Sequence, residues 1–174
     1  MNNTKFEKAR EILLEMINQR LYTDICTENK DYISAVDLNG DKFLAFNKIV
    51  KDLNIDEIQK FVNIMNEDNI NHILIMHINN PTPAVKNVIE NAPNIKKFIE
   101  LFNIDELQFN ITKHILVPEH ILLNKEDTKN FKLKFGIDIP VILNSDSVSK
   151  FYNFPKGHII KIMRKNFISY RIVK

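Results

Sequence analysis

Residues 72–78 form an almost continuous apolar run, His-Ile-Leu-Ile-Met-His-Ile, in a chain of 174 residues. A run of this length is typical of a strand that is buried on both faces of a sheet. Another strand is predicted over residues 43–46, and the segment between the two shows the apolar spacing of a helix. Asn54 has the side chain of a helix N-cap, and Glu57 follows three residues later. This order of strand, helix and strand predicts a βαβ unit and therefore an α/β fold.

Two further helices are predicted in the N-terminal part of the chain. The first begins with a capping box at Thr4 and Glu7 and continues to about Arg20. Between it and the βαβ unit, residues 37–43 resemble a calcium loop. However, Gly40 comes too early for such a loop and no glutamate ends it, so we expect only a turn before the next strand.

The second helix starts at Thr82, with Pro83 in the first helical position, just beyond the carboxyl end of the buried strand. The first turn of a helix carries unpaired N–H groups and a partial positive charge, which suit a phosphate group. Lys86 adds a cation one turn further on. We expect either a phosphate contact here or an ordinary structural connection, and the local sequence does not separate these two interpretations.

The C-terminal third has a different pattern of short elements. Asn124 is an expected N-cap for a helix that ends at Gly136, and Asp146 is an expected N-cap for a shorter helix. Residues 139–143 have the composition of a strand, while residues 158–164 and 167–173 alternate as in a hairpin. These elements predict a small α+β module with a short mixed sheet.

The stretch His-Ile-Leu-Val-Pro-Glu-His, residues 114–120, contains residue types that bind zinc. Pro118 disfavours a helix, and an extended segment would place His114 and His120 on one face but Glu119 on the other. We therefore predict an extended lead-in to the C-terminal module and no metal site.

Charge and cysteine content limit the class of protein. The net charge is only +2, yet no acidic residue follows Asp146 while seven lysines and arginines do. This basic end predicts an acidic partner or nucleic acid, although a solvated surface would have the same pattern. Cys26 is the only cysteine, which excludes an internal disulfide and predicts a buried or half-buried thiol in a reducing compartment. We find no signal-peptide core and no apolar run of membrane-spanning length, so we expect a location on the cytoplasmic or nuclear side and not secretion.

Two segments carry a family resemblance: NITKHILVPEHILLNKED at residues 110–127 and IPVILNSDSVSKFYNFPKGHIIKIMRKNFISYRIVK at residues 139–174. They resemble the shared fifth-largest subunit of eukaryotic nuclear RNA polymerases, whose C-terminal module by itself makes up a small subunit of archaeal polymerases. The chain departs from the family pattern at Val141, Ser147 and Asn153, and its last hairpin loop is shorter. Sixteen positions follow the pattern: His114, Leu116, Val117, Pro118, His120, Pro140, Ile142, Asp146, Val148, Gly157, Lys161, Ile162, Arg164, Tyr170, Arg171 and Val173.

The N-terminal part resembles the family less closely, with Thr82-Pro83-Ala84 in place of a T-P-S-A stretch. The resemblance implies that residues 1–108 are a jaw domain, α/β with a nuclease-like topology, beside the downstream DNA. It implies that residues 109–174 are an assembly domain that docks on the largest polymerase subunit. The compact form and a composition rich in isoleucine, asparagine and lysine suggest a version from a large DNA virus.

By this resemblance the chain is a non-catalytic subunit with no cofactor or metal of its own, acting in the nucleus or a cytoplasmic viral factory. Its expected partners are the largest subunit, other polymerase subunits and the backbone of downstream double-stranded DNA, without a membrane. For DNA contact we expect Thr82, Pro83 and Lys86. For docking we expect four residues of the basic hairpin, although the last two of them would equally suit internal packing: Lys161, Arg164, Tyr170 and Arg171.

Two other functions compete with this interpretation. A nuclease-like DNA-processing enzyme would need an aspartate and an acid-x-lysine pair to hold magnesium. Asp41 and the acidic residues at 52–57 do not have that spacing with a lysine. A free-standing DNA-binding regulator would need a helix with a base-reading face, and none of the predicted helices has one.

Overall fold

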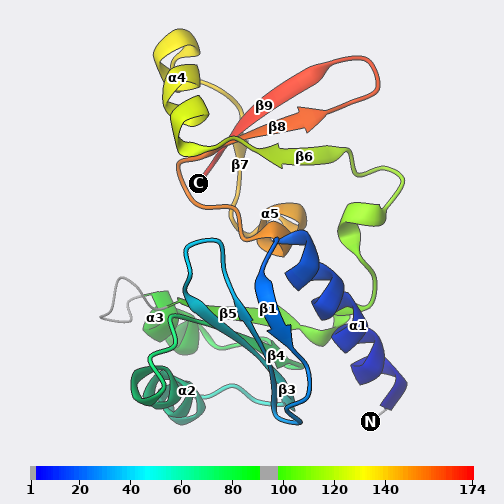
Figure 1. The fold of residues 1–174 in the computed structure, drawn as a ribbon, viewed down its shortest axis with the longest axis vertical. Coiled ribbons are helices and arrows are strands. Elements are labelled where there is room, and N and C mark those ends of the chain that lie inside the picture. Colours follow the sequence, from blue (N-terminus) through cyan, green and yellow to red (C-terminus); the bar gives the residue numbers. More distant parts are fainter. Residues whose placement is uncertain (1–2, 91–97) are drawn as a thin grey trace. The chain divides into compact units, whose positions relative to one another are not determined.

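The structure, a computed structural model, describes residues 3–90 and 98–174 and divides into two compact units (Figure 1). The first unit is Met1–Phe109 and the second is Asn110–Lys174. Helices and mixed sheets occur in both, so the predicted α/β class is confirmed. Within the described residues, no helix has the length and apolar character needed to cross a membrane.

The first unit is built on a five-stranded sheet with the order β1-β2-β3-β4-β5. Strands β1, β2 and β3 pair antiparallel, whereas β3, β4 and β5 run parallel, so the predicted βαβ unit is confirmed. The elements of the first unit are α1 (Asn3–Gln19), β1 (Thr23–Cys26), β2 (Tyr32–Val36), β3 (Lys42–Val50), α2 (Ile55–Glu67), β4 (His72–His77), α3 (Pro83–Glu90), β5 (Phe98–Asn103) and the 3₁₀ helix η1 (Ile104–Leu107).

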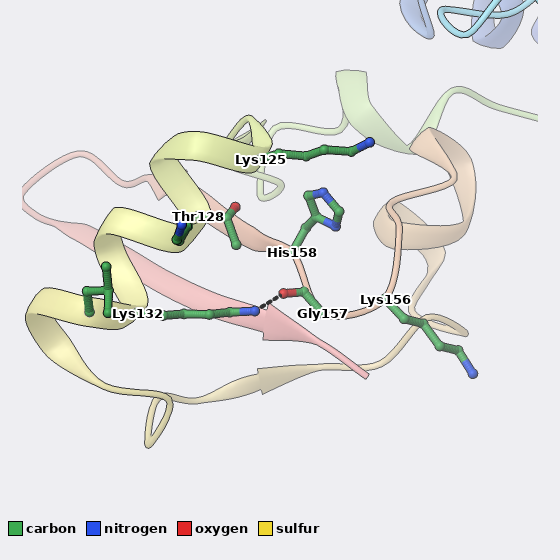
Figure 2. Close-up of a pocket in the computed structure, with 8 residues that line it drawn as sticks. Lys125, Thr128, Lys132, Lys156, Gly157 and His158 are labelled. Atoms are coloured by element: carbon green, nitrogen blue, oxygen red, sulfur yellow. Dashed lines mark hydrogen bonds between the residues drawn. The ribbon is translucent and has the colours of Figure 1, made fainter.

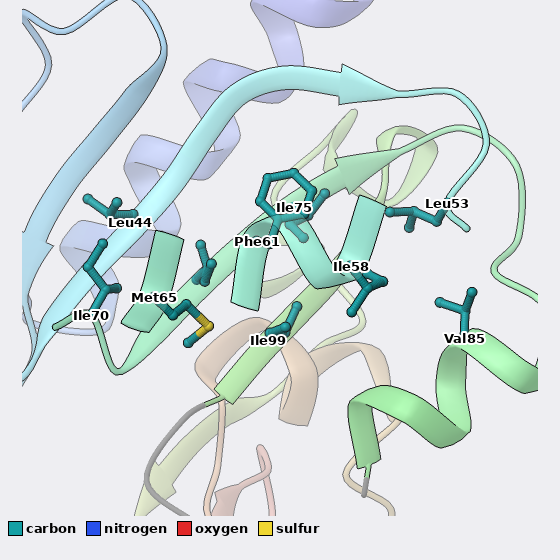
Figure 3. Close-up of a cluster of buried hydrophobic side chains, with 10 residues drawn as sticks. Leu44, Leu53, Ile58, Phe61, Met65, Ile70, Ile75, Val85 and Ile99 are labelled. Carbon is teal, nitrogen blue, oxygen red and sulfur yellow. The ribbon is translucent and has the colours of Figure 1, made fainter. Parts of the chain in front are cut away.

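Strand β4 lies in the middle of the parallel part of this sheet, and all six of its residues are buried. Alternate side chains point to opposite faces, so Ile73 and Ile75 share the face that packs against α2 and α3. Figure 3 shows this cluster, with Ile58 of α2 and Val85 of α3 directed toward the strands. Apolar burial on both faces explains why this run of sequence is continuous and not alternating.

The other face of β4 carries a buried polar network. Two guanidinium nitrogens of Arg20, the residue after α1, donate to the two carboxylate oxygens of Glu100 on β5, at 2.7 and 2.8 Å. His72 Nε2 hydrogen-bonds the same carboxylate, and Tyr22 lies edge-on to the His72 ring. The side chains of Arg20 and Glu100 are only 1% and 5% exposed. Burial alone would raise the pKa of Glu100, but the charges and hydrogen bonds of Arg20 and His72 lower it to about 2.

The structure corrects three expectations for the first unit. Thr4 lies inside α1, which already includes Asn3, so Thr4 is not its N-cap. Strands β1 and β2 were not predicted; Gly40, at φ 82°, ends the turn that joins β2 to β3. Cys26 is exposed at the end of the edge strand β1, and is not the buried or half-buried thiol that we expected.

The second unit contains a four-stranded mixed sheet with the order β6-β8-β9-β7, in which only the β7–β9 pair is parallel. The predicted caps are confirmed: Asn124 and Asp146 accept hydrogen bonds from the first turns of α4 and α5, and Gly136 ends α4 at φ 78°. The elements of the second unit are the 3₁₀ helix η2 (Ile111–Lys113), β6 (Glu119–Leu122), α4 (Lys125–Phe135), β7 (Val141–Ile142), α5 (Ser147–Tyr152), β8 (Ile159–Met163) and β9 (Ile168–Val173).

We expect Arg20→Met to lower the free energy of unfolding by about 3–5 kcal/mol, because it leaves the buried carboxylate of Glu100 without its main partner. Urea denaturation followed by circular dichroism measures this loss. Lys5→Met is the matched control: its ion pair with Asp105 is exposed, so removing it should cost less than about 1 kcal/mol. Equal losses in the two variants would show that burial of the Arg20–Glu100 pair has no special weight.

Candidate nucleic-acid and partner interfaces

The carboxyl ends of β3 and β4 meet at one edge of the sheet in the first unit. The loops that follow them are held together, because Asn79 donates its backbone N–H to Lys51 O at 3.1 Å and its side-chain amide to Asp52 at 2.5 Å. These loops lead into α2 and α3. The two helices therefore begin at the same sheet edge, which is where open α/β sheets bind ligands.

The start of α3 brings the three residues predicted for DNA contact into one helical turn. The Thr82 hydroxyl accepts from Val85 N at 3.4 Å, and its carbonyl accepts from Lys86 N at 3.1 Å. Val85 is buried and anchors the turn against the sheet, whereas Thr82, Pro83 and Lys86 are all exposed. The geometry therefore suits a phosphate contact, with a hydroxyl, a helix start and a cation available to solvent.

Charges around this edge are mixed. Lys51 is exposed directly after β3, and sequence reasoning missed it because the predicted strand ended at residue 46, whereas β3 continues to Val50. Asp56 and Glu57 occupy the first turn of α2, where Glu57 pairs with Lys60 at 2.6 Å. Such a surface can contact the phosphate backbone of DNA. The described part of it does not present a helix or strand that could enter a DNA groove and read the bases.

The acidic residues considered for a nuclease site do not come together. Asp41 precedes β3 and accepts a hydrogen bond from the Asn71 amide, whereas Asp52 follows β3 and accepts one from Asn79. The two carboxylates are thus at opposite ends of a nine-residue strand. In the described ranges, no group of three or more His, Cys, Asp or Glu side chains is arranged to hold a metal ion.

The hairpin predicted for docking divides its residues between two faces. Lys161 of β8 is directly opposite Tyr170 of β9, so the two side chains share a face of the sheet. On that face the Tyr170 ring contacts Phe131 of α4, with centroids 4.7 Å apart. Arg171 is opposite Ile160 on the other face, where its guanidinium donates to Val141 O at 3.4 Å.

Arg164 lies at the turn of the hairpin and not on either strand. Its backbone N–H donates to Phe167 O at 3.0 Å, and its guanidinium carbon is 5.7 Å from the centre of the exposed Phe167 ring. The four predicted residues therefore do not form one patch. Tyr170 and Arg171 contribute to the fold of the unit, while Arg164 and its neighbour Lys165 are the most exposed cations of the hairpin.

Residues 114–117 form a turn instead of the extended lead-in that we predicted. Val117 N donates to His114 O at 2.9 Å, and Leu116 N donates to His114 Nδ1 at 3.2 Å. The turn exposes Ile115 and Leu116, with 93% and 82% of their surfaces accessible. The local sequence carries no signal for this exposure, since both residues are apolar and lie next to a strand.

His114 and His120 are occupied by local hydrogen bonds. His120, on β6, bonds the Pro118 carbonyl through Nδ1 at 2.7 Å. Burial lowers the pKa of His120, with nearby Arg164 and Arg171 acting in the same direction and the Pro118 carbonyl and Asp146 opposing them. The neutral ring is thereby favoured, which suits a structural role beside the strand β8.

The second unit matches a known family. Residues 109–173 match the family described as RNA polymerase Rpb5, C-terminal domain. Over 187 aligned residues the chain is 29% identical to a subunit named for RNA polymerases I, II and III of Dictyostelium discoideum, covering 95% of both chains.

Two further relatives are matched over a shorter length. The RPABC1 subunit of Caenorhabditis briggsae is 31% identical over 70% of this chain and 61% of the relative. A protein of Invertebrate iridescent virus 6 that carries the name of a DNA-directed RNA polymerase subunit is 37% identical over 47% of this chain and 55% of the relative.

We expect Tyr170→Ala to lower the free energy of unfolding of the second unit by about 1–3 kcal/mol, because it removes a half-buried ring that contacts Phe131. Tyr170→Phe keeps the ring and should change stability by less than about 0.5 kcal/mol. Thermal unfolding of both variants tests this. An alanine variant as stable as the original chain would mean that Tyr170 serves a partner and not the fold.

Proposed function

Because residues 109–173 match the Rpb5 C-terminal domain and the chain aligns with the Dictyostelium RNA polymerase subunit over 95% of both chains, we propose that it works as a non-catalytic part of a DNA-directed RNA polymerase. The observation that carries this proposal is the alignment with the Dictyostelium subunit, which extends over nearly the whole of both chains. Both the first and the second unit therefore have counterparts in one polymerase subunit. Other polymerase subunits are its partners.

Our finer proposal gives the two parts of the chain separate tasks. Residues 1–108 act as a jaw domain near downstream DNA, and residues 109–174 act as an assembly domain that docks on the largest subunit. The exposed start of α3 supports the first task, because a helix start beside Lys86 suits phosphates of any sequence. The exposed hairpin turn supports the second, because Arg164 is charged and available.

The same reasoning leads us to propose a viral origin. The similarity to the iridescent virus protein supports this, as does a composition rich in isoleucine, asparagine and lysine. A viral polymerase subunit would act in the nucleus or in a cytoplasmic viral factory.

Affinity purification of a tagged chain from expressing cells should recover the two largest polymerase subunits in equal amounts. We expect Arg164→Glu to reduce that recovery at least about tenfold, because it reverses a charge at the exposed turn. Arg164→Lys keeps the charge and should retain most of it. Undiminished recovery with Arg164→Glu would move the docking surface away from the hairpin turn, and recovery of no polymerase subunit by the original chain would contradict the proposed function.

We expect Lys86→Gln to weaken the binding of duplex DNA by the assembled polymerase and to lower the salt dependence of that binding by about one counterion. The loss should be the same for unrelated DNA sequences, since a phosphate contact carries no base information. Lys42→Gln is the matched control, because Lys42 is exposed at the amino end of β3, away from the sheet edge where α3 begins. If both variants alter the salt dependence equally, the start of α3 is not a DNA contact.

A further inference from the structure

A pocket of about 500 Å³ in the second unit lies between α4 and the turn that precedes β8 (Figure 2). Lys125, Lys129 and Lys132 line it from the helix, and Lys156 and His158 line it from the turn. None of these residues belongs to the proposed docking site at the hairpin turn or to the proposed DNA contact at the start of α3.

The fold explains why these cations converge. Positions separated by four and three residues lie on one face of a helix, so the three α4 lysines point to the same side. Lys132 donates its ammonium to Gly157 O at 2.6 Å and thereby fastens the turn to the helix. Gly157 has φ 80°, a conformation that side chains disfavour, and it allows the turn that presents Lys156. The two walls of the pocket are therefore held in place by contacts of the fold itself.

The pocket has an excess of positive charge. No acidic side chain lines it, and Lys125, Lys129 and Lys156 form no ion pair with any part of the chain that the structure describes. Asp127 of α4 is engaged at the helix start, where it accepts from Asn124. His158 Nδ1 is buried and has no hydrogen-bond partner within the described ranges. A pocket lined by lysines and by no carboxylate favours an anionic ligand.

Apolar surface beside the lysines identifies the type of anion. Leu133, which is 77% exposed, forms part of the wall, and the aliphatic stems of the lysines supply more carbon surface. Phe135, the last residue of α4, and Ile137, just after it, are also exposed, although neither lines the pocket. A phosphate backbone would be better served by cations spread along a line than by cations around a hollow with apolar walls.

We propose that this pocket binds an acidic, partly apolar peptide segment of a partner protein. The glutamate or aspartate side chains of the segment would lie among Lys125, Lys129 and Lys156, and its apolar side chains would cover Leu133. This inference goes beyond the proposed function and uses neither the hairpin turn nor the start of α3. Its failure would therefore leave the polymerase proposal untouched.

Fluorescence anisotropy tests the proposal with the full chain and a labelled short peptide of alternating glutamate and leucine. We expect saturable binding, weakened at least about tenfold by Lys129→Glu and also weakened by Lys156→Gln on the opposite wall. Lys134→Glu is the matched control, because it changes the same charge on the same helix but does not line the pocket. It should weaken binding less than about twofold.

Thermal unfolding of each variant separates lost binding from lost folding, and Lys129→Gln replaces Lys129→Glu if the reversed charge destabilises the helix. Three results would overturn the proposal. The first is no saturable binding of the peptide, and the second is equal weakening by Lys129→Glu and Lys134→Glu. The third is displacement of the peptide by a duplex or single-stranded oligonucleotide at lower concentration than by unlabelled peptide, which would identify a nucleic-acid site.

Discussion

The ion pair between Arg20 and Glu100 is the interaction on which the arrangement of the first unit depends. It joins the end of α1 to strand β5 across 80 residues of sequence, and His72 of the central strand β4 bonds the same carboxylate. Apolar contacts alone tolerate small shifts of a helix across a sheet, but two buried charges must meet in one geometry. The pair thus determines where α1 lies against the sheet. Apolar residues of similar volume could make the unit equally stable, but they would not fix this position.

The buried strand β4 has a complementary role. Its apolar side chains on one face form the core with α2 and α3, and its other face carries the polar network beside α1. All residues of β4 are buried, and the chain leaves the core directly after the carboxyl end of this strand. The start of α3 there, with Thr82 just before the helix and Lys86 within it, is consequently presented to solvent at a position set by the sheet.

The second unit separates its functions among different elements. The face that carries Ile160 and Ile162 forms its small core, and Tyr170 on the opposite face contacts α4. Several exposed cations lie at the hairpin turn and around the α4 pocket. This division explains why four residues taken from one basic stretch of sequence turned out to have different environments. Strand alternation sends neighbouring residues to opposite faces.

The sequence by itself determined much of the local structure and the resemblance to a polymerase subunit. Asn54, Asn124 and Asp146 were recognisable as caps because a cap acts within three residues, and the β4 run was recognisable because its length and continuity are specific to a buried strand. Strands β1 and β2, the turn at residues 114–117 and the exposure of Cys26 were not, because their short segments lack a distinctive period.

Only the tertiary structure decided which distant side chains meet. Arg20 and Glu100 carry no pattern that pairs them, and nothing local relates Lys156 to the lysines of α4. Hydrogen bonds of caps and turns form within a few residues, whereas these contacts depend on strand order and on how the helices pack against the sheets. The start of α3 could be predicted as a local feature, whereas Lys51 was missed because β3 runs to Val50, past the predicted end of that strand at residue 46.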